Sequence, residues 1–324
     1  MEKFPCYANT FLWVVFTFLI AIMIAWIVVY FSLPNFNPFS DYDQVEQQYC
    51  ESLLPFTTYV GQTYIPEYNG VYELDLAKNL LSVSFASSQA NCANVAVTNP
   101  PGFNQKLRLE GPDPNDTTQT SLYGYIFWNV ETGYAIISFS GTITRSQWIS
   151  DFNFPLTPAT KLNNYVPGVQ CHEGFYKIYT SAQPLIWEWW RQYSTSISSI
   201  FITGHSLGGA ISTICAYDLA NIFGASTSDD PVYPIHYSFA APRSFNVIGA
   251  NNFAKIIPTS LRINNTEDIV PTLPPATWDN YTYEQTIGSI PFTKSLGSLI
   301  KDHVEAYAKY LPECPVVAPC LTDE

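Results

Sequence analysis

The chain has 324 residues, of which 47% are hydrophobic, 16% aromatic and only 13% charged. This composition is too apolar for a disordered protein, and the length allows one large α/β domain. With 27 acidic and 14 basic residues the net charge is −13, which excludes nucleic acid as a partner and excludes adsorption to anionic lipid by charge alone.

An uncharged apolar run covers residues 11–33. As a helix it would extend about 35 Å, enough to cross a bilayer core of about 30 Å, and Trp13 and Trp26 would suit the two interfaces. The alternative is a cleaved signal peptide, whose apolar core would be shorter, about 7–15 residues, and would end in small residues. We expect a cytoplasmic N-terminus (1–10), a transmembrane signal-anchor (11–33), a stalk (34–68) and one catalytic domain (69–324).

Charge, cysteines and sequons all favour a lumenal or extracellular domain. Lys3 precedes the apolar run, and the next basic residue after the run is Lys78. Positive charge near the run therefore lies on its short N-terminal side, which is the side expected to face the cytoplasm. Three Asn-X-Ser/Thr sequons follow the run, at Asn115, Asn264 and Asn280. Six of the seven cysteines also follow it. We expect Cys215 to be a buried thiol, so one of the remaining five must be unpaired or bridge another chain; these are Cys50, Cys92, Cys171, Cys314 and Cys320.

The patterning along the chain predicts an α/β fold. Apolar spacing predicts helices over 74–90, 174–191 and 207–222. Short β-branched and aromatic runs predict strands over 123–130, 134–139, 200–203, 236–240 and 260–263. Strands that alternate with helices indicate a mostly parallel or mixed sheet covered on both faces.

The central motif is Gly204-His205-Ser206-Leu207-Gly208, between the predicted strand at 200–203 and the helix at 207–222. This strand–turn–helix context is what a G-x-S-x-G nucleophile elbow requires, because the sharp turn projects the serine hydroxyl above the sheet. The bare pattern is weak evidence and an incidental serine is the alternative, but the context makes Ser206 the predicted nucleophile.

A serine hydroxyl needs a base, and the chain has four histidines. His205 should point away from Ser206 into packing beneath the sheet. His236 opens a buried strand, where a hydrogen-bonded core histidine is expected, and His172 precedes a helix that it could cap. His303, in a predicted loop near the C-terminus, is the best base because it gives the chain order Ser…Asp…His.

The acid should follow a strand end between the serine and the histidine. Asp268 does so and would fix the tautomer of His303. Glu267 and Asp279 are the competing carboxylates, and a solvated surface carboxylate is the ordinary alternative for any one of them.

Seven ordered blocks within about 72–310 resemble the class 3 lipases, the fungal-lipase-like α/β-hydrolases. They are Ser138–Thr142, Trp148–Phe152, Cys171–Tyr176, Gly204–Gly209, Phe239–Arg243, Asp268–Pro275 and Asp302-His303. Ser140 departs from the arginine usual in that family, which puts a supporting ion pair in doubt. The interval from Asp268 to His303 is also shorter than in the fungal members.

The resemblance implies an oxyanion hole from the backbone N–H groups of Thr142 and Leu207, with Asp151 steadying the oxyanion loop. It also makes residues 143–155 a lid that carries Trp148, Ile149 and Phe152. An apolar stripe that includes Phe154 could instead be core packing. Metal-ligand spacing is absent from the sequence, and this chemistry needs no cofactor.

Together these features predict an acylglycerol lipase that hydrolyses acyl esters at a membrane or droplet interface through an acyl-enzyme. A phospholipase or a non-lipid carboxylesterase is the alternative reaction. A catalytically silent lipid-binding protein is the alternative from another class, and the intact Ser-Asp-His set argues against it.

Overall fold

The computed structural model describes residues 72–92, 96–114, 116–141, 154–223, 234–257 and 260–313. The predicted anchor, the stalk and Asn115 lie outside them. None of the helices in the described part of the chain is long and apolar enough to span a membrane.

The central sheet has seven strands in the order β1-β2-β3-β6-β7-β9-β12. Strands β3, β6, β7, β9 and β12 run parallel, and β2 and β1 extend the sheet antiparallel at the β3 side. The prediction of a mixed sheet is therefore confirmed. The strands are β1 (Gln105–Pro112), β2 (Thr120–Asn129), β3 (Tyr134–Phe139), β6 (Ser199–His205), β7 (Pro234–Phe239), β9 (Ser260–Asn265) and β12 (Ser289–Phe292).

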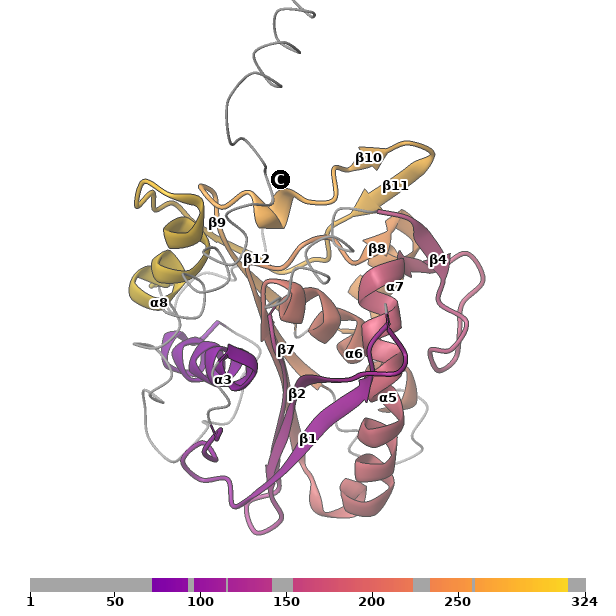
Figure 1. Ribbon diagram of the computed structural model, residues 1–324, viewed down its shortest axis with the longest axis vertical. Coiled ribbons are helices and arrows are strands. Elements are labelled where there is room, and N and C mark those ends of the chain that lie inside the picture. Colours follow the sequence, from indigo (N-terminus) through magenta and orange to yellow (C-terminus); the bar gives the residue numbers. More distant parts are fainter. Residues whose placement is uncertain are drawn as a thin grey trace, which may run out of the picture. The chain divides into compact units, whose positions relative to one another are not determined.

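Helices cover both faces of this sheet, as Figure 1 shows. Apolar side chains of α5 (Glu173–Tyr193), α6 (Leu207–Phe223) and α7 (Val247–Ile256) share one buried cluster with one face of the sheet. Those of α3 (Leu74–Cys92) and α8 (Ala306–Tyr310) share the cluster on the other face. Residues of β6 and β7 are almost all buried because central parallel strands are covered twice, and this is why they read as continuous apolar runs.

A second, five-stranded sheet was not predicted from the sequence. Its order is β10-β11-β8-β5-β4, and β10 and β11 lie at the upper right of Figure 1. The strands are β4 (Leu156–Pro158), β5 (Gln170–His172), β8 (Phe245–Asn246), β10 (Thr277–Trp278) and β11 (Tyr281–Glu284). Strands this short have too few residues to show an alternating pattern. Short helical turns complete the structure: η2 (Ser194–Ser196), η3 (Val270–Thr272) and η4 (Lys301–Glu305).

The sheet register brings the ends of several strands to one edge. Phe139 at the end of β3 pairs with Gly204, and His205 at the end of β6 pairs with Phe239 at the end of β7. Strand β9 ends at Asn265, three residues before Asp268. In open α/β sheets the carboxyl ends of parallel strands are where ligands bind, so the loops after these strands are the place to look for a site.

The structure also bears on three other predictions, which concern the cysteines, Phe154 and the sequon at Asn264. Cys215 is a buried thiol as predicted, and Cys171 is a second buried free thiol. Phe154 is buried against Leu156 and Tyr283, so this end of the apolar stripe is core. The sequon asparagine Asn264 lies inside β9, where its Oδ1 accepts hydrogen bonds from Arg262 and Ser289, a poor place for a glycan.

Candidate active site

The local backbone at Ser206 has the strained geometry of a nucleophile elbow. Ser206 lies between β6 and α6 with a φ of +60°, a region that non-glycine residues rarely adopt. A Cβ at Gly204 would lie 2.1 Å from the carbonyl oxygen of Gly208, so only glycine lets the strand and the helix approach so closely. The serine side chain is therefore fixed at the sheet edge by the spacing of the two glycines, as the motif predicts.

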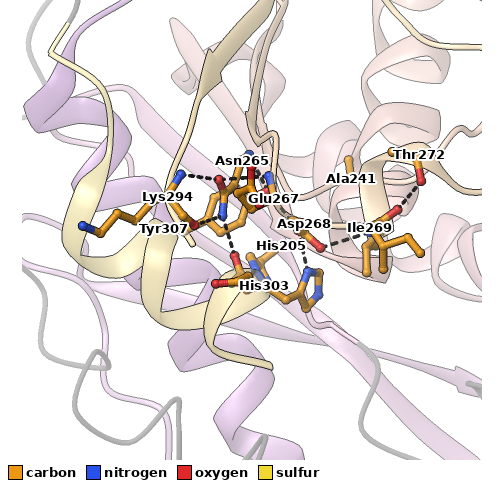
Figure 2. Close-up of polar contacts among 12 residues, drawn as sticks. His205, Ala241, Asn265, Glu267, Asp268, Ile269, Thr272, Lys294, His303 and Tyr307 are labelled. Carbon is orange, nitrogen blue, oxygen red and sulfur yellow. Dashed lines mark hydrogen bonds and ion pairs between the residues drawn. The ribbon is translucent and has the colours of Figure 1, made fainter. Parts of the chain in front are cut away.

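The structure brings Asp268 and His303 together. His303 Nδ1 lies 2.8 Å from Asp268 Oδ2, and the two residues are 6% and 2% exposed (Figure 2). The sequence analysis placed His303 in a loop. In the structure it lies in the π-helical turn η4, which leads into α8. The loop prediction was wrong because a five-residue turn gives no readable helical periodicity.

This pair has the hydrogen-bond arrangement that a general base needs. The carboxylate accepts the Nδ1–H, which leaves Nε2 as the acceptor of a proton from a nucleophile. Nε2 is buried and has no hydrogen-bond partner among the residues that the structure describes. His303 is thus held by Asp268 on one side and has its basic nitrogen unused on the other.

His205 connects the elbow to the base. Its ring lies 4.7 Å from the ring of His303, centroid to centroid, and its Nε2 donates to the carbonyl oxygen of His303 at 2.7 Å. Burial, with a smaller contribution from His303, holds the pKa of His205 well below its usual range. His205 is packed in the interior, as expected from the sequence. Its contact with His303 also places the base next to the nucleophile elbow.

A tyrosine that the sequence analysis did not single out forms a second hydrogen bond to the Asp268 carboxylate. Tyr307 donates its hydroxyl to Asp268 Oδ2 at 3.0 Å and accepts from the Asn265 N–H at 2.8 Å (Figure 2). Burial and the neighbouring Asp268 raise its pKa well above the usual range, so it stays a donor. Its position four residues after His303 on a helical segment was the available signal.

The competing residues lie elsewhere. Glu267 and Asp279 are exposed, so neither carboxylate is held against a histidine as Asp268 is. His172 caps α5 by accepting from the Phe175 N–H, and His236 lies between the hydroxyls of Ser212 and Ser260. Both structural roles match the expectations from the sequence.

These two buried histidines predict acid sensitivity of the fold. Burial lowers the pKa of His172 and of His236 from 6.5 to about 3, so both are neutral when folded. Their contribution to stability is complete above pH 6.5 and is lost as the pH falls toward 3, because only the unfolded chain takes up the protons. Each should lower the free energy of unfolding by about 1.4 kcal/mol per pH unit in that window.

Denaturant unfolding at intervals between pH 7 and 5 measures this slope. His236→Gln should reduce the slope by one histidine's share, whatever its effect on stability at pH 7. A free energy of unfolding that does not change over this range would contradict the prediction.

The oxyanion residues are described only in part. Leu207 is the first residue of α6, and the first N–H groups of a helix have no partner within it, so its amide is free to serve a developing oxyanion. Thr142, Asp151, Trp148, Ile149 and Phe152 lie outside the described residues. In the described part of the chain, no group of three His, Cys, Asp or Glu side chains could hold a metal ion.

Residues 136–278 match the family described as lipase (class 3). The central part of the chain is therefore similar to the class 3 lipases. Phospholipase A1-IIgamma of Arabidopsis thaliana is 30% identical over 58% of this chain and 52% of the relative. The chloroplastic phospholipase A(1) DAD1 of the same plant is 26% identical over 74% and 53%. The chain thus spans about half the length of these curated relatives.

A solved structure shows the same fold. It belongs to a triacylglycerol lipase whose catalytic centre is formed by a serine protease triad. The two chains are 20% identical, the match covers 74% of this chain and 92% of the other, and the TM-score is 0.50. At this identity the likeness is one of fold, in agreement with the mixed sheet and helices described above.

Proposed function

We propose that this chain is a class 3 lipase that hydrolyses acyl esters of lipids with Ser206 as nucleophile, His303 as general base and Asp268 as the acid that orients it. The 2.8 Å contact between Asp268 and His303, beside the strained elbow, is the observation that carries the proposal. Ser206 and Asp268 lie within residues 136–278, the part of the chain that matches the class 3 lipases, and His303 follows it.

The reaction follows from the geometry. Ser206 Oγ attacks the ester carbonyl carbon while His303 Nε2 takes the hydroxyl proton, and Asp268 stabilises the imidazolium that forms. The backbone N–H groups of Leu207 and Thr142 would stabilise the oxyanion. His303 then protonates the leaving alcohol, and a water molecule activated by the same histidine releases the fatty acid from the acyl-enzyme.

The substrate class is proposed from the relatives. The two plant relatives above are phospholipases A1, and another is a chloroplastic galactolipase. This favours a membrane glycerolipid with a polar head group over the neutral acylglycerol that the sequence alone suggested. The reaction at the ester carbonyl is the same for both.

A substrate panel tests the function. Fatty-acid release should be measured from phosphatidylcholine, a monogalactosyl diacylglycerol, di- and triacylglycerols and a short soluble ester, with Ser206→Ala as the matched control. We expect hydrolysis of at least one diacyl polar lipid at more than ten times the rate of the control. Release no faster than in the control from every substrate would overturn the proposed function, and release from the soluble ester alone would leave a non-lipid esterase.

The location of the enzyme is part of the proposal. An uncharged helix over residues 11–33 would hold an acidic protein at a bilayer, with the catalytic domain in a lumen or outside the cell, and residues 143–155 would act as the lid. The full chain should then stay with membranes after alkaline carbonate washing. Release into the wash, or a mature N-terminus near residue 34, would remove the anchor.

A further inference from the structure

A row of buried serines on α3 faces the central sheet. Ser84, Ser87 and Ser88 are fully buried, and their i, i+3 and i+4 spacing puts them on one side of the helix. Ser84 Oγ lies 3.2 Å from Thr203 Oγ1 on β6, and Ser87 Oγ donates to Ser138 Oγ on β3 at 3.0 Å. Figure 1 shows α3 on the face of the sheet opposite α5 and α6.

The last of these serines contacts backbone, not a side chain. Ser88 Oγ accepts a hydrogen bond from the Gly141 N–H at 2.8 Å, and both groups are buried. The same hydroxyl donates to the Ser84 carbonyl oxygen at 3.0 Å. Because the hydroxyl hydrogen is used in the bond to the Ser84 carbonyl, the oxygen can act only as an acceptor toward the Gly141 N–H.

The backbone that Ser88 holds lies directly against the nucleophile elbow. A Cβ at Gly208 would lie 2.3 Å from the carbonyl oxygen of Phe139 and 2.8 Å from that of Ser140. The segment that runs from the end of β3 to Gly141 is thus fixed between α3 and the start of α6. Gly208 follows Leu207, whose N–H is the proposed oxyanion donor.

We propose that Ser88 is a positioning residue for the oxyanion hole. By accepting the Gly141 N–H, it holds the backbone that follows β3 against the nucleophile elbow. The carbonyl groups of Phe139 and Ser140 in this segment lie against Gly208, so the held backbone supports the start of α6, where Leu207 presents its N–H. The proposal rests on the proposed function.

The effect should fall on the transition state and not on substrate binding. A donor held loosely must be organised during the reaction, which reduces the stabilisation of the developing charge without changing ground-state contacts. We expect Ser88→Ala to lower kcat by about 10- to 100-fold with KM changed less than about twofold. That is below the roughly 10²–10³-fold cost of losing an oxyanion donor altogether.

The matched control is Ser87→Ala, which removes an equally buried hydroxyl from the neighbouring position and breaks a contact with Ser138 on β3. Full-length wild type and both variants should be compared on the best substrate of the panel and on a boronic acid, whose tetrahedral serine adduct places an oxygen in the oxyanion hole. We expect the boronate to bind Ser88→Ala more weakly by about the same factor as kcat falls, and Ser87→Ala to differ from wild type by less than about threefold.

Two results would overturn the proposal. One is a kcat loss in Ser88→Ala no greater than in Ser87→Ala, and the other is a kcat loss with unchanged boronate affinity. Ser88→Thr keeps a hydroxyl acceptor and should recover most of the activity, so failure of Ser88→Thr in a folded protein would also count against it. An inactive wild type would instead contradict the proposed function, so the two failures are distinguishable.

Discussion

Replacing Ser206 with alanine should lower kcat/KM for every ester substrate by about 10⁴-fold or more. The alanine variant retains the Asp268–His303 pair and the Leu207 amide but has no nucleophile to form an acyl-enzyme. Initial rates of fatty-acid release with the purified wild type and variant measure the loss. A variant that kept more than about a tenth of the activity would show that another residue, or water alone, attacks the ester.

A second variant at this position separates catalysis from folding. Ser206 adopts a φ of +60°, which costs a non-glycine residue roughly 1–2 kcal/mol and costs glycine nothing. Ser206→Gly should therefore be as inactive as Ser206→Ala and yet have a higher melting temperature than wild type. A lower melting temperature would argue against strain at the elbow, whatever happened to activity.

Asp268→Asn should lower kcat by about 10⁴-fold with little change in KM. Asp268 Oδ2 accepts from both His303 Nδ1 and the Tyr307 hydroxyl, and an amide at this site can present its NH₂ group to the ring. That would favour the tautomer with the proton on Nε2, which cannot accept the serine proton. Steady-state kinetics with a saturating substrate measure the effect.

The competing carboxylates provide the controls for this assignment. Glu267 is the neighbour of Asp268 in sequence but is exposed, and Asp279 lies in the exposed turn between β10 and β11. Glu267→Gln and Asp279→Asn should each stay within about threefold of wild type. A loss in either variant as large as that in Asp268→Asn would mean that the acid had been assigned to the wrong residue.

The parts of the fold that the sequence predicts are those with local and continuous patterns. Strand β3 begins and ends at the predicted residues, and the predicted helices at 174–191 and 207–222 correspond to α5 and α6. The elements that were missed include β1 and β12 at the two edges of the central sheet, the five strands of the second sheet, the turn η4 and the helix α7. Their stability comes from pairing and packing with distant segments, which a local sequence pattern does not reveal.

The same distinction separates the site residues. The Ser206 elbow is a local constraint set by Gly204 and Gly208, so the motif was sufficient to find it. Tyr307 and Ser88 contact their partners across 39 and 53 residues of sequence, and neither belongs to a motif. The pairing of Asp268 with His303 was predicted because chain order and the resemblance to a family supplied the long-range information that single residues lack.

The most direct test of the account is to label the full-length protein with a fluorophosphonate and to map the modified peptide by mass spectrometry. A serine activated by His303 should react and an ordinary serine should not, so we predict one phosphonylated residue, Ser206, and no labelling of Ser206→Ala or of heat-denatured protein. A catalytically silent lipid-binding protein would remain unlabelled. Absence of the adduct in folded wild type, or its attachment to any other residue, would contradict the assignment of Ser206 as the nucleophile.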